Sequence, residues 1–513
     1  MPHYSSTKTV TGLLRQQAET YRDKDYLIDP NTGRHYSYEE YDSLTSQVAS
    51  ILKREGVAHG DRICLVLGNS PMYNIITHGV QKAGAVAVLV NTGLLPQDVL
   101  YIAENSSTEL VITDRESSNL TNSVKTAHPY IPIMSADDIK FTPKYRDFSN
   151  FTFPDVKADD GALVLYTSGT TGKPKGAMLT HLNVMHNAEI MAKHNGMYGK
   201  RGLNIQPPFY TDGQILMMLS TLSAGGSIVQ PNDFTVGEFW KLAKKYATHF
   251  SAVMPTNLSM LLNESQTPDK NRMEFLLCSA AALSPKLHEE FERTFGVPIV
   301  EGYGLTEAGS YSTCNLPVPK SKFVPGESNK FRVIGSVGKP IGNDMRIVDP
   351  DTGSELKQGD IGEILIRGPN VMKGYLNNTS ATTETVQNGW LYTGDLGNAD
   401  RDNNYFIKGR KKDMVVHGGQ KVFAREVEDV LYANPYVKHA AIIPTPHDIM
   451  GEDVKALVVL RDGAHVTERE LMDYCRQNLA AWKSPTHVQF IESMPLSSSG
   501  KILKRVLIER YGN

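Results

Sequence analysis

"LYTSGTTGKPKGAMLTH", residues 165–181, gathers hydroxyls, glycines and lysines directly after an apolar start. It overlaps the end of an apolar run, GALVLY at 161–166, that is typical of a buried strand. Three glycines and a proline interrupt TSGTTGKPKG, so we expect a loop there and neither a helix nor a strand. A glycine-rich turn after a strand can aim several backbone N–H groups at one point, and a nearby lysine adds positive charge. The stretch therefore predicts a loop that holds a polyphosphate.

The spacing of this loop differs from that of the Walker phosphate loop. Pro174 stands five residues after Gly169, where that motif has glycine, and no GKS or GKT follows. A P-loop kinase is therefore a poor interpretation.

Outward from the loop, helical and strand patterns alternate along the chain. Residues 36–56 have helical spacing, 61–68 form a short apolar run, 72–84 are helical again and 85–91 resemble a second strand. Such alternation predicts helices that cover a mostly parallel sheet, with ligands bound beyond the carboxyl ends of the strands.

The pattern changes after residue 330, where short strand candidates are separated by turn residues. A charge-rich run near 401–419 then precedes a compact stretch with two helical and two strand patterns. We predict an α/β N-terminal domain at 1–410, with mixed parallel sheets, helices and a small β-rich subdomain. A small, mobile α+β C-terminal domain is expected at 411–513.

Composition excludes several function classes. The 513 residues are 40% hydrophobic and 21% charged with a formal net charge of −3, which gives no electrostatic case for nucleic acid or an anionic membrane. The N-terminus has no signal-like apolar core, and the longest apolar stretch, 213–229, is too short and polar to span a bilayer. We expect a cytoplasmic protein. The four cysteines have no paired spacing and are expected to be buried fillers.

Five ordered motifs carry a family resemblance. YTSGTTGKPKGAMLTH (166–181), EGYGLTEAG (301–309), GWLYTGDLG (389–397), GRKKDMVVHGGQKV (409–422) and PLSSSGKILKRVL (495–507) resemble the signature motifs of the adenylate-forming superfamily. That superfamily contains acyl-CoA synthetases, nonribosomal adenylation domains and beetle luciferases. The N-terminal third is most similar to the acyl-CoA synthetase type, and to bacterial fatty-acid CoA ligases in particular.

The resemblance implies a two-step ligase that uses ATP, Mg²⁺ and CoA. A carboxylic acid is first activated as acyl-AMP with release of pyrophosphate, and the acyl group then passes to a thiol. The implied ligands of the β- and γ-phosphates are Thr167, Ser168, Gly169, Thr170, Thr171, Gly172 and Lys175.

The second and third motifs are implied to bind the rest of the nucleotide. Within Gly302, Tyr303 and Gly304, the tyrosine would stack on adenine, and Ser279, Ala280 and Ala281 would line the adenine and acyl walls. Thr306 would donate to the α-phosphate, and Glu307 would bind Mg²⁺ with Thr167 nearby. Asp395 would accept hydrogen bonds from the ribose hydroxyls, assisted by Arg410. A core aromatic and a turn-capping aspartate are the ordinary alternatives for Tyr303 and Asp395.

The last two motifs imply a moving domain. Lys501 would reach between the substrate carboxylate and the α-phosphate during adenylation, and Lys412 would be the hinge. After rotation, Gly418 and Gly419 would line the tunnel for the thiol of pantetheine, with Tyr210 at the same tunnel.

The acyl pocket is expected to contain Tyr210, Asp212, Asn257 and Gly309. Typical fatty-acid ligases often have histidine at the position of Tyr210 and a Gly-Gly-Ala run where this chain has SAAA. Because a buried unpaired carboxylate is costly, Asp212 must be solvated, paired within the protein, or facing a polar substrate group such as an ammonium.

Other functions stay open at this level. The acceptor could be the phosphopantetheine of a carrier protein instead of CoA, because both present the same thiol. A non-catalytic nucleotide-binding homologue is disfavoured by the joint presence of Glu307, Asp395, Arg410 and Lys501. A luciferase-like oxygenase would still adenylate first.

Overall fold

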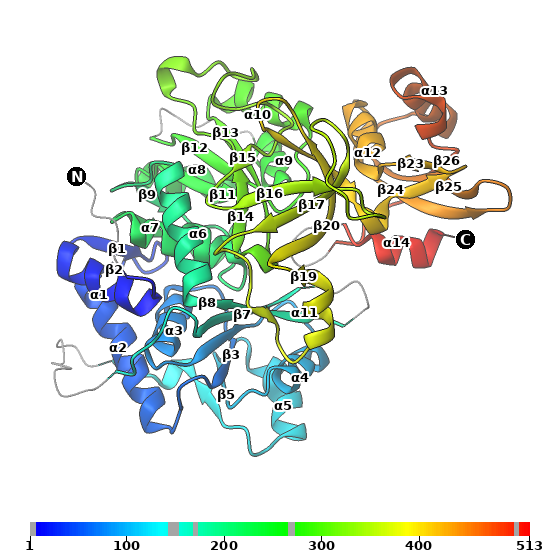
Figure 1. Ribbon diagram of the computed structural model, residues 1–513. Helices are drawn as coiled ribbons and strands as arrows, with labels where there is room; N and C mark the ends of the chain where they lie inside the picture. The colour runs from blue at the N-terminus through cyan, green and yellow to red at the C-terminus, as the bar shows by residue number, and fades with distance from the viewer. Residues whose placement is uncertain (1–6, 142–152, 168–172, 265–271, 497–501, 513) are drawn as a thin grey trace.

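The structure is a computed structural model that describes residues 7–141, 153–167, 173–264, 272–496 and 502–512 (Figure 1). A large N-terminal α/β domain contains two mixed sheets and a β-rich subdomain, and a smaller α+β C-terminal domain projects from one side. The predicted fold class is confirmed.

A seven-stranded sheet contains the phosphate-loop strand, in the order β18-β8-β7-β4-β3-β5-β6. Its central strands are apolar on both faces because helices cover them. The strands are β3 (Arg62–Val66), β4 (Val86–Leu89), β5 (Leu110–Thr113), β6 (Ile133–Ser135), β7 (Gly161–Thr167), β8 (Lys175–Thr180) and β18 (Gly374–Tyr375). The helices near it are α2 (Tyr38–Arg54), α3 (Pro71–Lys82), α4 (Pro96–Asn105), α5 (Asn122–Ala127) and α6 (His181–His194).

A nine-stranded sheet lies beside it, in the order β15-β14-β13-β12-β11-β9-β10-β1-β2. Strands β10, β9, β11, β12 and β13 are parallel neighbours, so their carboxyl ends share one edge. The strands are β1 (Asp25–Ile28), β2 (His35–Ser37), β9 (Arg201–Leu203), β10 (Ser227–Val229), β11 (Phe250–Val253), β12 (Phe275–Cys278), β13 (Ile299–Leu305), β14 (Ser310–Cys314) and β15 (Lys339–Pro340). The associated helices are α1 (Val10–Tyr21), α7 (Ser220–Ser223), α8 (Val236–Lys245), α9 (Pro255–Asn263) and α10 (Pro285–Phe295).

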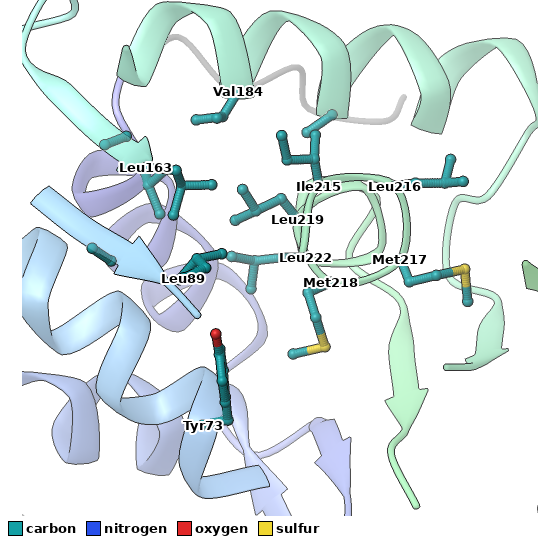
Figure 2. Close-up of a cluster of buried hydrophobic side chains, with 14 of the residues drawn as sticks. Tyr73, Leu89, Leu163, Val184, Ile215, Leu216, Met217, Met218, Leu219 and Leu222 are labelled. Carbon is teal, nitrogen blue, oxygen red and sulfur yellow. The ribbon is translucent and has the colours of Figure 1, made fainter. Parts of the chain in front are cut away.

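One hydrophobic core joins these two sheets. The apolar run at 213–229 begins as a π-helix, η3 (Asp212–Leu219), and continues into α7 and β10. Figure 2 shows Leu219 and Leu222 on the same side of this segment as Leu89 and Tyr73, and all four side chains are buried. The segment is therefore core, and among the described residues no helix is long and apolar enough to cross a membrane.

The β-rich subdomain follows as an antiparallel sheet, in the order β16-β17-β20-β19 with β21 on β20. Its elements are β16 (Asp344–Val348), β17 (Gly362–Arg367), α11 (Thr379–Thr385), β19 (Val386–Gln387), β20 (Trp390–Ala399) and β21 (Tyr405–Arg410). Long strand β20 carries the motif GWLYTGDLG, and β21 returns beside it, so the register places Asp395 opposite Arg410.

The smaller C-terminal domain has a sheet of its own and a separate core of buried side chains. Its elements are β22 (Val415–His417), β23 (Gln420–Val422), α12 (Ala424–Ala433), β24 (Val437–His447), β25 (Gly451–Leu460), α13 (Glu468–Asn478), β26 (His487–Phe490) and α14 (Lys504–Tyr511). The β24–β25 hairpin points away from the large domain in Figure 1.

The structure corrects one expectation about local structure and confirms another. The end of TSGTTGKPKG is strand and not loop, because Lys175 and Gly176 begin β8, which pairs antiparallel with β7. Glycine and proline in the sequence predicted a loop and missed this strand, because the strand forms by pairing with β7 and not from its local residue preferences. The four cysteines are buried thiols, as predicted.

Candidate active site

The carboxylate of Glu307 receives two hydroxyl donors beside the phosphate loop. Glu307 lies in η4 (Thr306–Ala308), and its Oε1 accepts hydrogen bonds from Thr167 Oγ1 at 3.2 Å and from the Tyr375 hydroxyl at 2.8 Å. The ammonium of Lys175 lies 5.2 Å from the centroid of the Tyr375 ring, within cation–π range. Three predicted site residues from distant motifs therefore meet in one place. Ser168, Gly169, Thr170, Thr171 and Gly172 lie outside the described residues.

Sequence reasoning missed Tyr375. It comes from β18, which pairs with β8 in the register Tyr375↔Ala177, and that pairing carries the hydroxyl to Glu307. Burial raises the pKa of Tyr375, so at neutral pH its hydroxyl is a proton donor. The dipeptide GY at 374–375 is the sequence signal for this residue, but sequence spacing alone cannot identify the strand with which it pairs.

A second cluster gathers Tyr303, Asp395 and Arg410. The Tyr303 hydroxyl donates to Asp395 Oδ2 at 2.7 Å, and Arg410 Nε lies 3.0 Å from Asp395 Oδ1. Asp395 is almost fully buried, while the Arg410 side chain is half exposed. The Asp395 carboxylate raises the pKa of Arg410, and burial raises the pKa of Tyr303. The cluster is therefore a fixed anion that is charge-balanced by one arginine.

Two glycines before Glu307 are required by close packing. A Cβ on Gly304 would lie 1.7 Å from the Ser310 carbonyl oxygen, and one on Gly302 would lie 2.3 Å from the Tyr311 ring. Contacts this short force the backbone to move. Glycine is therefore needed for the β13–β14 hairpin that presents Tyr303, Thr306 and Glu307.

Asp212 occupies the first position of the π-helix and is held by two serines. Its Oδ2 accepts from Ser279 Oγ at 2.8 Å, and its Oδ1 accepts from Ser310 Oγ at 3.2 Å. The charge of Asp212 also raises the pKa of Tyr311 and of Cys278, although burial is the larger cause at both groups. Of the three expectations for Asp212, pairing within the protein is confirmed.

Two residues of this region have backbone conformations that L-residues rarely adopt. Ala280 has a φ of 71° and Ser310 has a φ of 141°. Strain of this kind is concentrated at functional sites. The positive φ of Ala280 gives a physical reason why glycine suits this run, and an alanine here must tolerate the left-handed conformation.

The other predicted acyl-pocket residues have structural contacts of their own. Asn91 Nδ2 donates to the Tyr210 hydroxyl at 3.1 Å. Asn257 Oδ1 accepts from the Met254 backbone N–H at 2.8 Å and so caps α9, a structural role for a residue that was expected in the acyl pocket. Gly309 has a φ of 68°, which favours glycine.

The proposed hinge and thiol-tunnel residues lie in the connection between the domains and just beyond it. Lys412 is exposed in the short 3₁₀ turn η6 (Lys411–Asp413) between β21 and β22. The Gly418 N–H donates to the carbonyl of Met450 at 2.9 Å, at the β24–β25 hairpin that points away from the large domain (Figure 1). Gly418 and Gly419 therefore lie apart from the Asp395 cluster in this arrangement. Lys501 lies outside the described residues.

Glu301 is a buried carboxyl group that sequence reasoning did not single out. It is 4% exposed in the middle of β13, immediately before Gly302. Burial raises its pKa to about 8, although the nearby charge of Arg425, from the small domain's helix α12, acts in the opposite direction. The group is therefore mostly protonated at neutral pH.

We expect Glu301 to make stability fall as pH rises. In the unfolded chain the carboxyl ionises near its ordinary pKa of 4.5, whereas the folded protein keeps the proton up to about pH 8. The stabilising contribution is thus complete below pH 4.5 and is lost as pH rises towards 8. In Glu301→Gln the fall in unfolding free energy between these pH values should be smaller than in wild type, as denaturant titrations at several pH values would show. Glu290→Gln, on exposed α10, should reproduce the wild-type slope, and an identical slope in Glu301→Gln would contradict the assignment.

The donor set beside the phosphate loop suits a hard cation. Glu307 supplies a carboxylate and Thr167 a hydroxyl, which are the oxygen ligands that Mg²⁺ prefers. In the described part of the chain, no group of three or more His, Cys, Asp or Glu side chains gathers to hold a metal alone. Such a site fits a cation that is bound mainly by substrate phosphates.

Comparison with known proteins identifies relatives over the whole chain. The model of the AMP-binding enzyme family matches residues 14–376, and the model of the AMP-binding enzyme C-terminal domain matches residues 426–501. A sulfoacetate–CoA ligase of Cupriavidus necator is 29% identical over 98% of this chain and 97% of its own length. An oxalate–CoA ligase of Arabidopsis thaliana is 30% identical over 98% of each.

Among solved structures, MatB from Rhodopseudomonas palustris is similar throughout. Its ATP-bound form has a TM-score of 0.88 at 29% identity, covering 98% of this chain and 99% of that one. The apo form of the same protein has a TM-score of 0.78 at the same identity and coverage. The arrangement described here is thus closer to the ATP-bound form.

Proposed function

The chain belongs to the AMP-binding enzyme family and is an AMP-forming acid–CoA ligase, and we propose that the acid it activates carries an ammonium or other hydrogen-bond-donating group. The carboxylate attacks the α-phosphorus of ATP, and the P–O bond to pyrophosphate breaks. The CoA thiol then attacks the acyl carbon, loses its proton and displaces AMP. Relatives named as CoA ligases support CoA as the acceptor, and nothing favours a carrier protein.

The contacts of the described residues support their proposed nucleotide roles. Asp395 is fixed by Tyr303 and Arg410, so its carboxylate is oriented to accept the ribose hydroxyls without further reorganisation. Thr306 precedes Glu307 and would donate to the α-phosphate, while Lys175, at the start of β8, would bind the β- and γ-phosphates. The strands thus place donors and charge around the phosphorus under attack.

Glu307 and Thr167 would hold Mg²⁺, which neutralises phosphate charge when it is bound with ATP. Since Thr167 and Tyr375 both donate to Oε1, the second carboxylate oxygen of Glu307 keeps lone pairs for the cation. Tyr375 therefore acts as a positioning residue for Glu307.

Tyr375→Phe should weaken Mg²⁺-dependent ATP binding more than it destabilises the fold. The variant keeps the ring and removes the donor to Glu307, so we expect the Mg²⁺ concentration at half-maximal ATP binding to rise by about three- to tenfold. Equilibrium ATP binding measured across Mg²⁺ concentrations checks this directly, without turnover.

Tyr166→Phe is the matched control for this change. The Tyr166 hydroxyl donates to Asn105 Oδ1 at 2.7 Å on the same sheet and does not reach Glu307. An equal shift in both variants would show that Tyr375 acts only through the general stability of the sheet.

We propose that the segment 411–513 rotates between the two steps about Lys412. Two observations support this. The glycine pair Gly418–Gly419 lies at the outer hairpin, so it must move to meet the acyl-adenylate, and the overall arrangement is nearer to an ATP-bound relative than to its apo form. The arrangement of the two domains in the structure would then be the one that forms the acyl-adenylate, which is the step that Lys501 serves.

The Asp212 cluster carries the proposal about the acid. Because Ser279 and Ser310 both donate their hydroxyl protons to Asp212, the cluster combines a negative charge with hydroxyl oxygens that act as acceptors. A pocket wall of acceptors with a negative charge is complementary to a donor-bearing or cationic acid and unfavourable for a second carboxylate or a bare hydrocarbon. Acid-dependent ATP–pyrophosphate exchange, screened over amino-bearing, hydroxy, dicarboxylic and unsubstituted acids, tests this class.

A further inference from the structure

A basic cavity lies at the amino ends of the parallel strands, at the opposite edge of the sheet from Ser279. Asp25, Arg201 and Ser227 are the first residues of β1, β9 and β10, and His249 directly precedes β11. The cavity has a volume of about 230 Å³, and its polar lining consists of Lys24, Asp25, Arg201, Ser227, His249 and Arg272. None of these residues belongs to the nucleotide or acyl site.

The donors of this cavity are held by hydrogen bonds within the protein. Arg201 Nε donates to Ser227 Oγ at 2.9 Å and one of its terminal nitrogens donates to the Tyr246 carbonyl at 2.8 Å. The terminal nitrogens carry further N–H donors, and a guanidinium fork of this kind binds oxyanions. His249 Nδ1 accepts from the Arg201 backbone N–H at 3.1 Å, so the neutral imidazole carries its proton on Nε2 and is also a donor.

Positive charge is in excess around the cavity. Lys24 donates to the Gly225 carbonyl, and both burial and the nearby Arg201 charge lower its pKa. Asp25, the acidic lining residue, is engaged by His35 Nδ1 at 2.8 Å. The nearby charges of Lys200 and Glu274 cancel each other, because the two side chains form an ion pair at 2.8 Å. Lys24 and Arg201 are therefore two fixed positive charges that repel each other, and Arg272 lies beside them. A bound anion would reduce this repulsion.

We propose that this cavity is a second, non-catalytic binding site for the phosphate group of a small metabolite. A phosphate dianion balances Lys24 and Arg201, and its oxygens match the Arg201 fork, the Lys24 ammonium and the His249 Nε2–H. A carboxylate carries one charge and two oxygens, and so would satisfy fewer of these donors.

The test separates this site from the phosphate loop by mutation. Binding of labelled inorganic phosphate to the full-length protein is measured by equilibrium dialysis at low ionic strength, in Lys175→Gln to weaken the loop. We expect one saturable site to remain, with sulfate competing and acetate not competing. Adding Lys24→Gln and Arg272→Gln should weaken it by about tenfold or more, since the charge-assisted contact of Lys24 and the neighbouring positive charge of Arg272 are both lost.

The matched control removes the same charge from outside the cavity. Lys241→Gln with Lys245→Gln, on the exposed face of the adjacent helix α8, should leave phosphate affinity within about twofold, because these lysines do not line the cavity and salt screens their charges over that separation. Equal weakening by both pairs, or no saturable site in Lys175→Gln, would overturn the proposal. Competition by acetate as strong as by sulfate would overturn the assignment to phosphate.

Discussion

Replacing Lys501 by alanine is expected to reduce acyl-adenylate formation by roughly a hundredfold or more, the loss typical of removing one donor that acts in the transition state. The lysine would stand between two approaching anions, the substrate carboxylate and the α-phosphate. Its removal should leave thioester formation from supplied acyl-adenylate largely intact. Measuring the two half-reactions separately checks this, and Lys438→Ala, an exposed lysine of the same domain, should change neither.

Gly419→Leu should give the opposite pattern. Gly419 has a φ of 78° and no neighbouring atom within 4 Å of a built Cβ, so a leucine there meets open space in the described arrangement. After rotation the same side chain would block the thiol path and slow thioester formation alone. Gly463→Leu is the matched control, because that glycine has a φ of 73° and equally open surroundings. Equal damage to both half-reactions by Lys501→Ala and by Gly419→Leu would contradict the two-arrangement mechanism.

Asp212→Asn should change the choice of acid. The substitution keeps size and polarity, and the serine hydroxyls can rotate to accept from the new amide, so the fold is preserved. For an acid with an ammonium group we expect kcat/KM to fall by about 30-fold to several-thousand-fold, equivalent to about 2–5 kcal/mol, because the substrate charge is left unpaired. Unsubstituted acids should be spared. Steady-state kinetics with a matched pair of amino-bearing and plain acids measures the difference.

Ser279→Ala separates charge from hydrogen-bond geometry. It removes one donor to Asp212 but leaves the carboxylate, so its effect should be within about tenfold and similar for both acids. A wild-type enzyme that prefers plain straight-chain acids to every amino-bearing acid would contradict the proposed substrate class.

The sequence predicted those parts of the site that depend on local pattern and motif order. Alternating apolar and helical runs predicted helices on mixed parallel sheets, and the structure brings Thr167 to Glu307 and Tyr303 to Asp395 across intervals of 140 and 92 residues. The resemblance, and not the spacing, assigned these residues to one nucleotide site.

Contacts that depend on long-range register could not be predicted. Tyr375 reaches Glu307 only because β18 pairs with β8. Asp212 meets Ser310 only because the π-helix packs against β14. The protonation of Glu301 depends on burial, which raises its pKa, and on the opposing charge of Arg425 from the other domain. Sequence periodicity reports which face of an element is apolar, but not which distant side chain covers it.

An acyl-adenylate mechanism is tested best by acid-dependent exchange of labelled pyrophosphate into ATP without CoA. Because acyl-AMP forms before the thiol enters, exchange should require the acid and Mg²⁺ but not CoA. Adding CoA should then produce AMP and the acyl-CoA thioester in equal amounts. Formation of ADP and phosphate, or exchange that appears only when CoA is present, would contradict an acyl-adenylate mechanism.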